Sequence, residues 1–419
     1  MPASATLHEK SQEISRMKPK LVVVGAGMAS GRMLEHLFKA QPDAYDVTLF
    51  GAEPRGNYNR IMLSPVLAGE TTFGDLVIHD AAWYATHGVT CRFGETVTKI
   101  DRASKTIYSR NGGTPYDKLV IATGSAPFVI PIAGKELQGV LTFRDLDDVN
   151  AMLAFAGRPG MKVVVLGGGL LGLEAAAGLR ARGMGVTVLH LMGHLMERQL
   201  DPMAGRLLQR ALEARGIDVH CNAQTTAILG HRRAEAVLLD DGTIYPADLV
   251  VMATGIRPET RIATDAGLTI ERGIVVDDQM RTSDPDIFAI GECAERAGIC
   301  YGLVEPLFDM AAVAAKALSG EDAAFRPAQF GTHLKVSGVN VFSAGDFLGN
   351  PGTEQIVLSD PGLGTYKKLV IKDGRLVGAV LFGDTADGLW YLELIRDGAS
   401  IETFRQDLVF GRPSTSAAA

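Results

Sequence analysis

The sequence predicts an α/β protein that contains two similar β-turn-α-β folds followed by a smaller α+β domain. Three observations predict this class. A glycine-rich turn between an apolar run and a helical pattern begins at Gly25 and again at Gly167. Each fold has a later apolar run that ends in Ala-Thr-Gly. From about residue 326 apolar and polar residues alternate, which is typical of antiparallel strands.

Composition and charge exclude several classes of protein. The 419 residues correspond to about two or three domains, and 47% hydrophobic against 21% charged residues indicate well-packed cores. A formal net charge of −7 argues against a nucleic-acid-binding protein. The longest apolar stretch without charges, residues 119–134, is interrupted by Gly124, Pro127 and Pro131 and is not expected to span a membrane. Without a secretory signal and with four cysteines, we expect a cytoplasmic protein.

The first fold begins with a buried strand over residues 19–24, because its apolar run is continuous and short. The turn Gly25-Ala26-Gly27-Met28-Ala29-Ser30 follows, then a helical pattern, and then a second strand over 46–50. A strand, a G-x-G-x-x-small turn and a helix in this order are the fingerprint of a dinucleotide-binding fold. Ser30 stands where the third glycine is usual.

The second fold repeats this order with the full fingerprint. A strand over 162–166 runs into Gly167, Gly169 and Gly172, and a helix and a strand over 186–189 follow. Flanking strands and helices at both turns predict two separate Rossmann-like dinucleotide-binding folds.

Three further strands are expected to end at ligand-binding edges. The runs 119–124 and 249–255 both end in Ala-Thr-Gly, and the strand 287–292 ends in Gly291-Glu292. In open α/β sheets, ligands bind outside the carboxyl ends of the strands. We therefore expect these turns to line binding sites.

The order of these elements predicts the domain boundaries. Residues 372–375 (Lys-Asp-Gly-Arg) indicate a hairpin within the last domain, and a helix is expected over 386–396. We expect a tail over 1–18, a first nucleotide domain over 19–145 and 271–325, a second over 146–270, an α+β domain over 326–405 and a tail over 406–419.

Together, these motifs resemble the FAD-dependent pyridine nucleotide reductases over residues 20 to about 325. The stretches 58–64 (YNRIMLS), 191–201 (LMGHLMERQLD) and 282–286 (TSDPD), with Gly291-Glu292-Cys293, are similar to the flavin portion of the NAD(P)H-dependent nitrite reductase large subunit. Residues 326–405 resemble the next domain of that subunit. The iron–sulfur and sirohaem segments of the full-length subunit are not among these residues, so we expect only its flavin module.

The resemblance implies that the first fold binds FAD. Backbone N–H groups at a helix N-terminus suit a pyrophosphate, and an arginine adds a charge-assisted hydrogen bond. Glu53 is the nearest acid for the ribose, and the alternative is an ordinary solvated loop acid. Glu292 would accept from the ribityl hydroxyls, and the helix that follows Glu305 would face the flavin ring. The implied FAD residues are Gly25, Gly27, Met28, Ala29, Ser30, Glu53, Arg60, Ala122, Thr123, Gly124, Gly291, Glu292 and Glu305.

The resemblance also implies that the second fold binds NAD(P)H. Glu174 would approach the nicotinamide as the catalytic residue, and the alternative is a helix acid favoured by the macrodipole. Similar rubredoxin reductases often carry a lysine after a Leu-Ser pair, where this chain has Pro65, so a Lys–Glu pair beside the flavin is in doubt. The implied NAD(P)H residues are Gly167, Gly169, Leu170, Leu171, Gly172, His190 and Gly255.

His190 leaves the choice between NADH and NADPH open. It stands at the end of the second strand, where NAD enzymes usually place an acid for the ribose diol. An imidazole cannot copy that acceptor and could face a 2′-phosphate, with Arg198 nearby, or it could be a strand-end histidine without a cofactor role. The retained Gly172 favours NADH slightly.

The cysteines argue against a disulfide-reducing subclass. Cys91, Cys221, Cys293 and Cys300 form no closely spaced pair, and Met62-Leu63-Ser64 occupy the turn where single-cysteine relatives carry their thiol. Their spacing also fits neither an iron–sulfur cluster nor a zinc site, so no metal is expected. Only Cys293 and Cys300 lie close enough in sequence to be worth a test.

We therefore expect a flavoprotein that takes a hydride from NAD(P)H onto FAD and passes electrons to a protein redox centre in nitrite or nitrate reduction. The acceptor would be a sirohaem, iron–sulfur or molybdenum reductase. One alternative is a reductase for rubredoxin or ferredoxin, and another is a low-turnover flavoprotein that senses NADH. A homodimer is left open.

Overall fold

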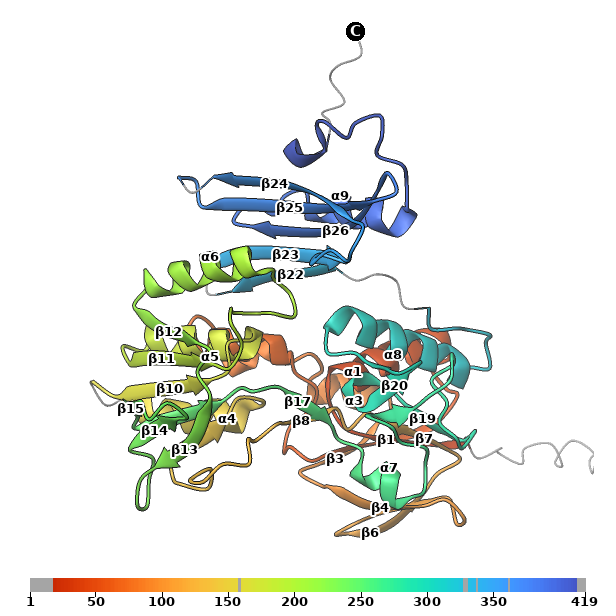
Figure 1. Cartoon of the computed structure of the whole chain (residues 1–419). Helices are drawn as coiled ribbons and strands as arrows, with labels where there is room; N and C mark the ends of the chain where they lie inside the picture. Colours follow the sequence, from red (N-terminus) through yellow and green to blue (C-terminus); the bar gives the residue numbers. More distant parts are fainter. Residues whose placement is uncertain (1–17, 157–159, 327–330, 337, 361, 413–419) are drawn as a thin grey trace, which may run out of the picture. The chain divides into compact units, whose positions relative to one another are not determined.

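The computed structural model describes residues 18–156, 160–326, 331–336, 338–360 and 362–412. They divide into two units (Figure 1). The first holds the described residues up to Tyr58 together with Val77–Ser125 and Pro258–Phe325. The second holds Asn59–Leu76, Ala126–Arg257 and the described residues from Arg326 onward. Of the two expected tails, residues 1–17 and 413–419 lie outside the described part of the chain.

A parallel sheet in the order β19-β7-β1-β2-β3 forms the centre of the first unit. Leu21 pairs with Val47 on one side and with Lys118 on the other. The strands at the centre of the sheet are largely apolar because both faces of a parallel sheet are covered, whereas the edge strand β3 (Thr90–Phe93) is only half-buried. The strands of this sheet are β1 (Lys20–Val24), β2 (Asp46–Gly51), β3 (Thr90–Phe93), β7 (Lys118–Ile121) and β19 (Ile287–Ala289).

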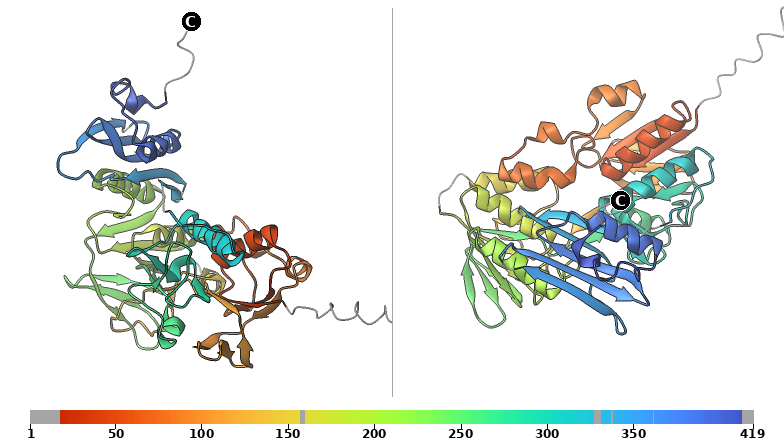
Figure 2. Two further views of the ribbon diagram at one scale, coloured as in Figure 1. Left: turned by 90° about the vertical axis from the view of Figure 1, so that its right-hand side faces the viewer. Right: turned by 90° about the horizontal axis from the view of Figure 1, so that it is seen from above.

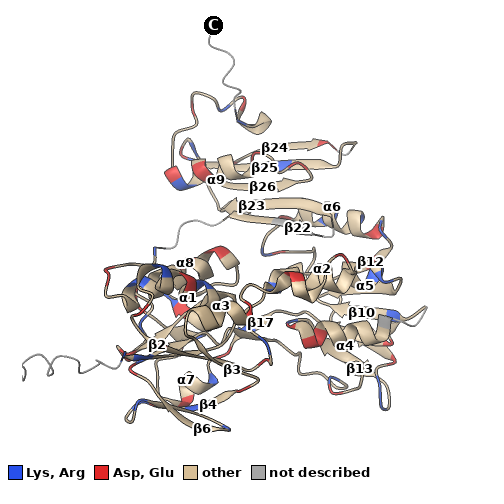
Figure 3. Cartoon of the chain, turned by 180° about the vertical axis from the view of Figure 1, so that it is seen from behind, with Lys and Arg blue, Asp and Glu red and all other residues tan. Residues whose placement is uncertain are grey.

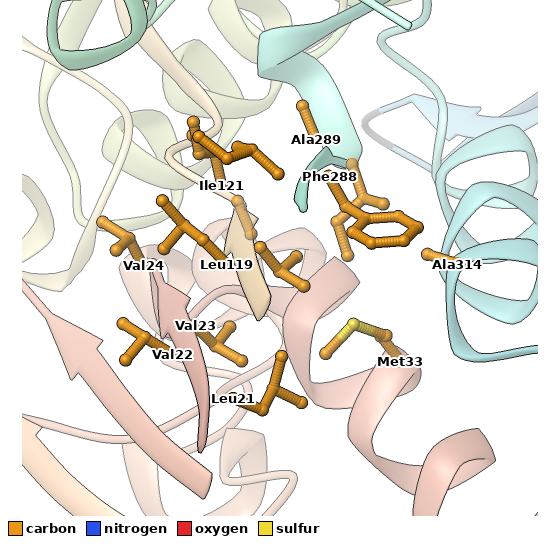
Figure 4. Close-up of a cluster of buried hydrophobic side chains, with 14 of the residues drawn as sticks. Leu21, Val22, Val23, Val24, Met33, Leu119, Ile121, Phe288, Ala289 and Ala314 are labelled. Atoms are coloured by element: carbon orange, nitrogen blue, oxygen red, sulfur yellow. The ribbon is translucent and has the colours of Figure 1, made fainter. Parts of the chain in front are cut away.

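Two helices pack together against this sheet. Helix α1 (Met28–Ala40) follows the first glycine turn, and α8 (Val304–Leu318) lies beside it in both views of Figure 2. Met33 of α1 and Ala314 of α8 are fully buried with the apolar residues of β1, β7 and β19 (Figure 4). The last strand of this sheet therefore comes from a segment that the chain reaches only after it has passed through the second unit.

The smaller elements of the first unit surround this core. Three antiparallel strands, β4 (Val97–Asp101), β5 (Thr106–Ser109) and β6 (Gly112–Pro115), form a separate sheet. The remaining elements are α3 (Ala81–Thr86), α7 (Arg261–Asp265), β18 (Ile274–Val275), the 3-10 turn η3 (Gly291–Cys293), β20 (Ala294–Arg296) and β21 (Ile299–Cys300). Two short strands, β8 (Ser125–Pro127) and β17 (Ile256–Pro258), pair where the chain passes between the units.

The second unit repeats the parallel architecture in the order β12-β11-β10-β16-β9. This repetition confirms the predicted pair of Rossmann-like folds. The elements are β9 (Val140–Thr142), α4 (Leu146–Ala156), β10 (Lys162–Leu166), α5 (Leu170–Ala181), β11 (Gly185–His190), α6 (Pro202–Glu213), β12 (Ile217–Cys221) and β16 (Leu249–Met252), with an antiparallel sheet of β13 (Thr225–Leu229), β14 (Ala236–Leu239) and β15 (Ile244–Pro246).

The segment 59–76 belongs to the second unit, although its sequence position is inside the first fold. It contains η1 (Arg60–Met62), α2 (Leu63–Ala68) and η2 (Phe73–Leu76). Helix α2 packs closely on α5, because a Cβ on Gly178 would lie 2.9 Å from Cγ of Leu67. Arg182 Nε also donates to the Leu67 carbonyl at 2.8 Å and so satisfies a carbonyl at the end of α2.

The C-terminal residues form an antiparallel sheet in the order β22-β23-β26-β25-β24 with one helix, as the predicted α+β domain requires. The predicted hairpin is confirmed, since Lys372 pairs with Arg375 around Asp373 and Gly374, which both have positive φ. The elements are β22 (Gly331–Val336), β23 (Val339–Gly345), β24 (Glu354–Asp360), β25 (Thr365–Lys372), β26 (Arg375–Phe382), α9 (Gly388–Asp397) and η4 (Leu408–Phe410).

A buried polar cluster joins the C-terminal sheet to the second nucleotide fold. Asp201 caps α6 by accepting from the Ala204 N–H at 3.0 Å. Its other oxygen accepts from the Tyr366 hydroxyl at 2.7 Å and lies 3.6 Å from Lys368 Nζ. All three side chains are buried. Burial raises the pKa of Tyr366, and the Asp201 carboxylate raises it further, so the hydroxyl stays protonated and donates.

We expect Tyr366→Phe to lower the free energy of unfolding by about 1.5–3 kcal/mol, because the buried Asp201 carboxylate loses a hydrogen-bond donor. Chemical denaturation followed by circular dichroism measures the change. Tyr108→Phe, at a side chain that is 37% exposed, is the control and should leave the midpoint where it is. Equal midpoints for Tyr366→Phe and the unaltered protein would contradict the assigned contribution.

Candidate functional site

The first glycine turn is held against the end of strand β7. Gly25 has φ +114°, and a Cβ there would lie 2.1 Å from the Ala122 carbonyl oxygen. Thr123 donates from Oγ1 to the Glu259 carbonyl at 2.7 Å, and Gly124 accepts from the Glu259 N–H at 2.9 Å. The predicted Ala-Thr-Gly residues thus lie beside the predicted glycine turn, at the carboxyl edge of the sheet.

The same turn leaves an open helix N-terminus. Gly27 is the N-cap of α1, and no side chain there caps the helix. A Cβ on Gly27 would meet nothing within 4 Å. The first N–H groups of α1, which begins at Met28 and Ala29, therefore face a space in which an anionic pyrophosphate fits. The residues present fit the phosphate portion of a dinucleotide.

A buried asparagine, Asn57, holds this turn through hydrogen bonds, and the sequence analysis did not single it out. Asn57 is fully buried, and its Nδ2 donates to the Gly27 carbonyl and, at 3.3 Å, to Ser30 Oγ. Ser30 in turn donates from Oγ to the Gly27 carbonyl at 2.9 Å. The Tyr84 hydroxyl donates to Asn57 Oδ1. Ser30, the imperfect third position of the fingerprint, thus takes part in holding the turn.

The predicted ribose acid and the Gly-Glu turn also belong to the first unit. Glu53 Oε2 accepts from the Tyr58 hydroxyl at 2.9 Å and from Arg55 at 3.4 Å, two residues after the end of β2. Glu292 accepts from Ser125 Oγ at 2.8 Å. The two carboxylates are therefore oriented by hydroxyl groups, a feature that spacing in the sequence does not reveal.

The Gly-Glu turn lies next to the first helix. Gly291 has φ +82°, and a Cβ there would lie 3.3 Å from Cβ of Ala29. Glu305 is an exposed residue in the first turn of α8, next to Val304 at its start. The first unit thus brings most of the predicted FAD residues to one sheet edge, whereas Arg60 belongs to the second unit.

The second glycine turn has the same construction. A Cβ on Gly167, which has φ +120°, would lie 2.3 Å from the Ala253 carbonyl oxygen, and one on Gly172 would lie 2.1 Å from the Gly167 carbonyl oxygen. Gly169 caps α5 without a side chain, and a Cβ there would meet nothing within 4 Å. Leu170 and Leu171 begin the helix, and Gly255 has φ +116° in open space. This cradle also fits a pyrophosphate.

His190 ends strand β11 as predicted, but neither ring nitrogen is free. The Gly168 N–H donates to Nδ1 at 3.0 Å, and Nε2 lies 3.1 Å from Oε2 of Glu197. His190 as a whole residue is buried, at 6% exposure. Glu197 was not singled out from the sequence, because its seven-residue offset from His190 matches no local motif.

Glu174 lies on α5 and pairs with a residue from the segment 59–76. Ser64 Oγ donates to Glu174 Oε2 at 2.7 Å. Burial raises the pKa of Glu174, and the Ser64 hydrogen bond opposes that shift. Arg60, on η1, donates to the Arg144 carbonyl at 3.3 Å. Pro65 stands at the position where the resemblance implies a lysine, and the partner of Glu174 is instead the preceding residue, Ser64.

The four thiols are free, and none is activated. Burial raises the pKa of Cys91 to about 11 and also raises the pKa of Cys221, Cys293 and Cys300. A thiolate is the reactive form, so these positions disfavour nucleophilic or redox chemistry.

The described residues show neither a metal centre nor a membrane span. They contain no cluster of His, Cys, Asp and Glu suited to a metal ion, and no helix among them is long and apolar enough to cross a membrane. Lys and Arg are interspersed with Asp and Glu along the chain (Figure 3).

The family model that describes the pyridine nucleotide-disulphide oxidoreductases matches residues 19–317. The chain belongs to this family. It is an FAD-dependent NAD(P)H oxidoreductase, as the resemblance predicted. A second model, the C-terminal domain of rubredoxin NAD+ reductase, matches residues 331–399. The two glycine turns at the carboxyl edges of the two parallel sheets are the features of this chain that suit the family's two cofactors.

Two curated members of the family come from Bacillus subtilis (strain 168). The chain is 47% identical over 386 residues to a nitrite reductase (NAD(P)H). The aligned region covers 92% of this chain and 48% of that relative. It is 39% identical over 401 residues to an assimilatory nitrate reductase electron transfer subunit. The aligned region covers 95% of this chain and 52% of that relative. The chain thus spans about half the length of these relatives.

One solved structure resembles most of this chain. The NADH:rubredoxin oxidoreductase from Clostridium acetobutylicum matches with a TM-score of 0.78 and 26% identity, over 92% of this chain and 97% of that one. In contrast to the two curated relatives, that protein is about as long as this chain.

We expect Glu292→Ala to weaken FAD binding about ten- to hundredfold, because a charged hydrogen-bond acceptor is lost. Fluorescence titration of the FAD-free protein measures the dissociation constant. Glu271→Ala, at an exposed acid of the same unit, is the matched control and should leave the constant unchanged. If both variants bind FAD as tightly as the unaltered protein, Glu292 has no role in holding the cofactor.

A pH-dependent stability test follows from the raised pKa of Glu174. Because the folded chain holds this proton more tightly than the unfolded chain, the carboxyl favours folding at low pH, and its contribution is lost as the pH rises through the folded-state pKa. Glu174→Gln is neutral at every pH. The Tm difference, variant minus unaltered protein, should therefore grow from about pH 5 to about pH 8.

Ser64→Ala removes the hydrogen bond that opposes the shift and should move this dependence to higher pH. Glu213→Gln, at an exposed glutamate of α6, is the matched control for the change of a carboxyl to an amide. A difference for Glu174→Gln that shrinks as the pH rises would refute the sign of the shift.

Proposed function

We propose that the protein carries electrons from NAD(P)H to a protein redox centre that reduces nitrite or nitrate. FAD, when bound, supplies the chemistry that the chain lacks, since it accepts a hydride from NAD(P)H and passes electrons on. The acceptor would be a sirohaem and iron–sulfur reductase or a molybdenum reductase. The similarity to a nitrite reductase and to a nitrate reductase electron transfer subunit supports this choice.

The observation that carries the proposal is the state of the cysteines. A reductase that stores electrons in a disulfide needs a thiolate near the flavin, either as a close pair or as a single residue in the flavin-facing turn. By the family resemblance, Met62, Leu63 and Ser64 occupy that turn in this chain. The raised pKa of each of the four thiols further disfavours a thiolate. We therefore propose that electrons leave directly from the flavin to another protein.

In this proposal, the residues of the chain bind the two cofactors and orient the groups around them. The uncapped N-termini at Gly27 and Gly169 bind the two pyrophosphates. Asn57 holds the first turn in shape, and Glu292 receives hydroxyl donors beside Ser125. Ser64 keeps its proton on Oγ and directs it at Glu174, so that the orientation of this carboxylate is set before the nicotinamide arrives.

A reductase for rubredoxin or ferredoxin is the second candidate. It is favoured by the match of residues 331–399 to the C-terminal domain of rubredoxin NAD+ reductase and by the likeness to a rubredoxin oxidoreductase over nearly its whole length. The acceptor protein is recognised by surface residues that the fold does not prescribe.

The deciding experiment is anaerobic reduction of the FAD-loaded protein by NADH and by NADPH, followed by mixing with separate acceptors. We expect rapid bleaching of the flavin absorbance and the fastest recovery with a nitrite- or nitrate-reducing protein. Faster recovery with rubredoxin or ferredoxin would favour the second candidate. Slow recovery with every acceptor would indicate an NADH-sensing flavoprotein, and a flavin that neither nucleotide reduces would overturn the proposal.

We further propose that the protein acts in the cytoplasm, where thiols stay reduced, since its four cysteines are free. Sedimentation of the purified chain decides between a monomer and the homodimer that the sequence leaves open.

Cysteine-independent electron transfer is a separate prediction. With Cys91, Cys221 and Cys300 changed to Ser and the buried Cys293 changed to Ala, we expect NAD(P)H-dependent reduction of a one-electron dye within about tenfold of the original rate, since packing losses account for such a change. Stopped-flow absorbance follows both half-reactions. A folded, FAD-loaded variant that NAD(P)H reduces but that cannot reduce the dye would reveal a thiol relay.

A further inference from the structure

The contacts of His190 define its tautomer. A backbone N–H can only donate, so Nδ1 of His190 must accept from Gly168 and carry no proton. The proton of the neutral ring is then on Nε2, which donates to Glu197 Oε2 at 3.1 Å. His190 is 8% exposed at its side chain, whereas Glu197 is 27% exposed. His190 therefore has no free nitrogen that could accept a hydrogen bond from a ligand, whereas the Glu197 carboxylate can still accept one.

The segment that carries Glu197 is held against the same glycine turn. Met196 donates from its N–H to the Gly168 carbonyl at 3.0 Å, so that Gly168 is hydrogen-bonded on both sides. Met196 has φ +53°, a left-handed conformation that a side chain rarely adopts and that this contact maintains. A Cβ on Gly168 would lie 2.5 Å from Leu195 and 2.8 Å from His190. Glu197 is therefore held next to the turn and is not on a free loop.

We propose that Glu197, oriented by His190, is the carboxylate that accepts the adenine-ribose hydroxyls and makes the second fold select NADH over NADPH. In other folds of this type an acid at the end of the second strand performs this task. Here the strand ends in His190, and the carboxylate belongs to Glu197, seven residues later. His190 orients that carboxylate through the hydrogen bond from Nε2. A negative charge at this place repels the 2′-phosphate of NADPH.

The neighbouring Arg198 offers the opposite selectivity, because a guanidinium suits a phosphate. It is exposed, however, whereas the Glu197 carboxylate is oriented by a buried imidazole. Pre-oriented groups lose less conformational freedom on binding, which favours the carboxylate as the group that determines selectivity. Arg198→Ala therefore belongs in the test as the competing explanation.

The inference rests on the proposed binding of NAD(P)H to the second fold, so binding is measured without turnover. Isothermal titration of the FAD-loaded protein with ADP-ribose and with 2′-phospho-ADP-ribose isolates the contribution of this end of the nucleotide. The unaltered protein should bind ADP-ribose more tightly. Glu197→Ala should reduce the ratio of the two affinities at least tenfold, through weaker ADP-ribose binding, because an acceptor with a full charge is lost.

Two further variants separate the roles of the pair. His190→Asn places an amide oxygen where Nδ1 accepts from Gly168 but removes the Nε2 donor, so it should keep the turn and shift the ratio in the same direction by a smaller factor. His190→Asp combined with Glu197→Ala returns a carboxylate to the strand end and should restore the preference for ADP-ribose. Glu213→Ala, at an exposed acid of α6, is the matched control and should leave the ratio unchanged.

The outcomes separate failure of the proposed function from failure of the role assigned to Glu197. If NADH does not reduce the flavin and ADP-ribose does not bind, the proposed function fails. If ADP-ribose binds and Glu197→Ala leaves the affinity ratio within twofold of the original, only the role of Glu197 is overturned. A tighter affinity for 2′-phospho-ADP-ribose that Arg198→Ala abolishes would also overturn it, and would assign selectivity to the arginine.

Discussion

In both nucleotide folds, a backbone carbonyl oxygen stands where the first glycine of the turn would carry its Cβ. The Ala122 oxygen would be 2.1 Å from a Cβ on Gly25, and the Ala253 oxygen 2.3 Å from one on Gly167. Only a residue without a side chain allows the turn to approach the adjacent strand so closely. This approach places the Ala-Thr-Gly residues and the open helix N-terminus at one edge of the sheet. The remaining site residues are arranged around that edge.

Polar side chains stabilise these turns from positions that are distant in the sequence. Asn57 reaches Gly27 and Ser30 in the first unit, and His190 reaches Gly168 in the second. His190 satisfies the Gly168 N–H, which would be costly to leave unpaired in a buried place. Asn57 adds a donor to the Gly27 carbonyl, which also accepts from the Gly31 N–H and from Ser30 Oγ. The two supports differ chemically, since an amide donates in the first turn and an imidazole nitrogen accepts in the second. The two folds are therefore similar in backbone and different in the groups that hold it.

The segment 59–76 supplies the hydrogen-bond partner of Glu174. Its sequence lies within the first nucleotide fold, yet α2 packs on α5 through Leu67 and Gly178, and this packing brings Ser64 to Glu174. A hydroxyl in this place orients the carboxylate without adding a charge, whereas a lysine would form an ion pair. Burial of a carboxylate without a cation raises its pKa, as observed for Glu174. A hydroxyl partner without a positive charge therefore leaves the pKa of the Glu174 carboxyl raised.

The sequence alone determined the two parallel folds, their glycine turns and the hairpin at Asp373 and Gly374, because these features depend on local apolar runs and on backbone conformations that glycine permits. It also marked Glu174, His190 and Glu292 by their places after strands and turns. Only the tertiary structure decided the partners of these three residues, namely Ser64, Glu197 and Ser125. The cap of α6 by Asp201 and its bond to Tyr366 were equally hidden. Most of these contacts join side chains more than a hundred residues apart, and all of them depend on distances of a few ångströms, which periodicity and spacing do not encode.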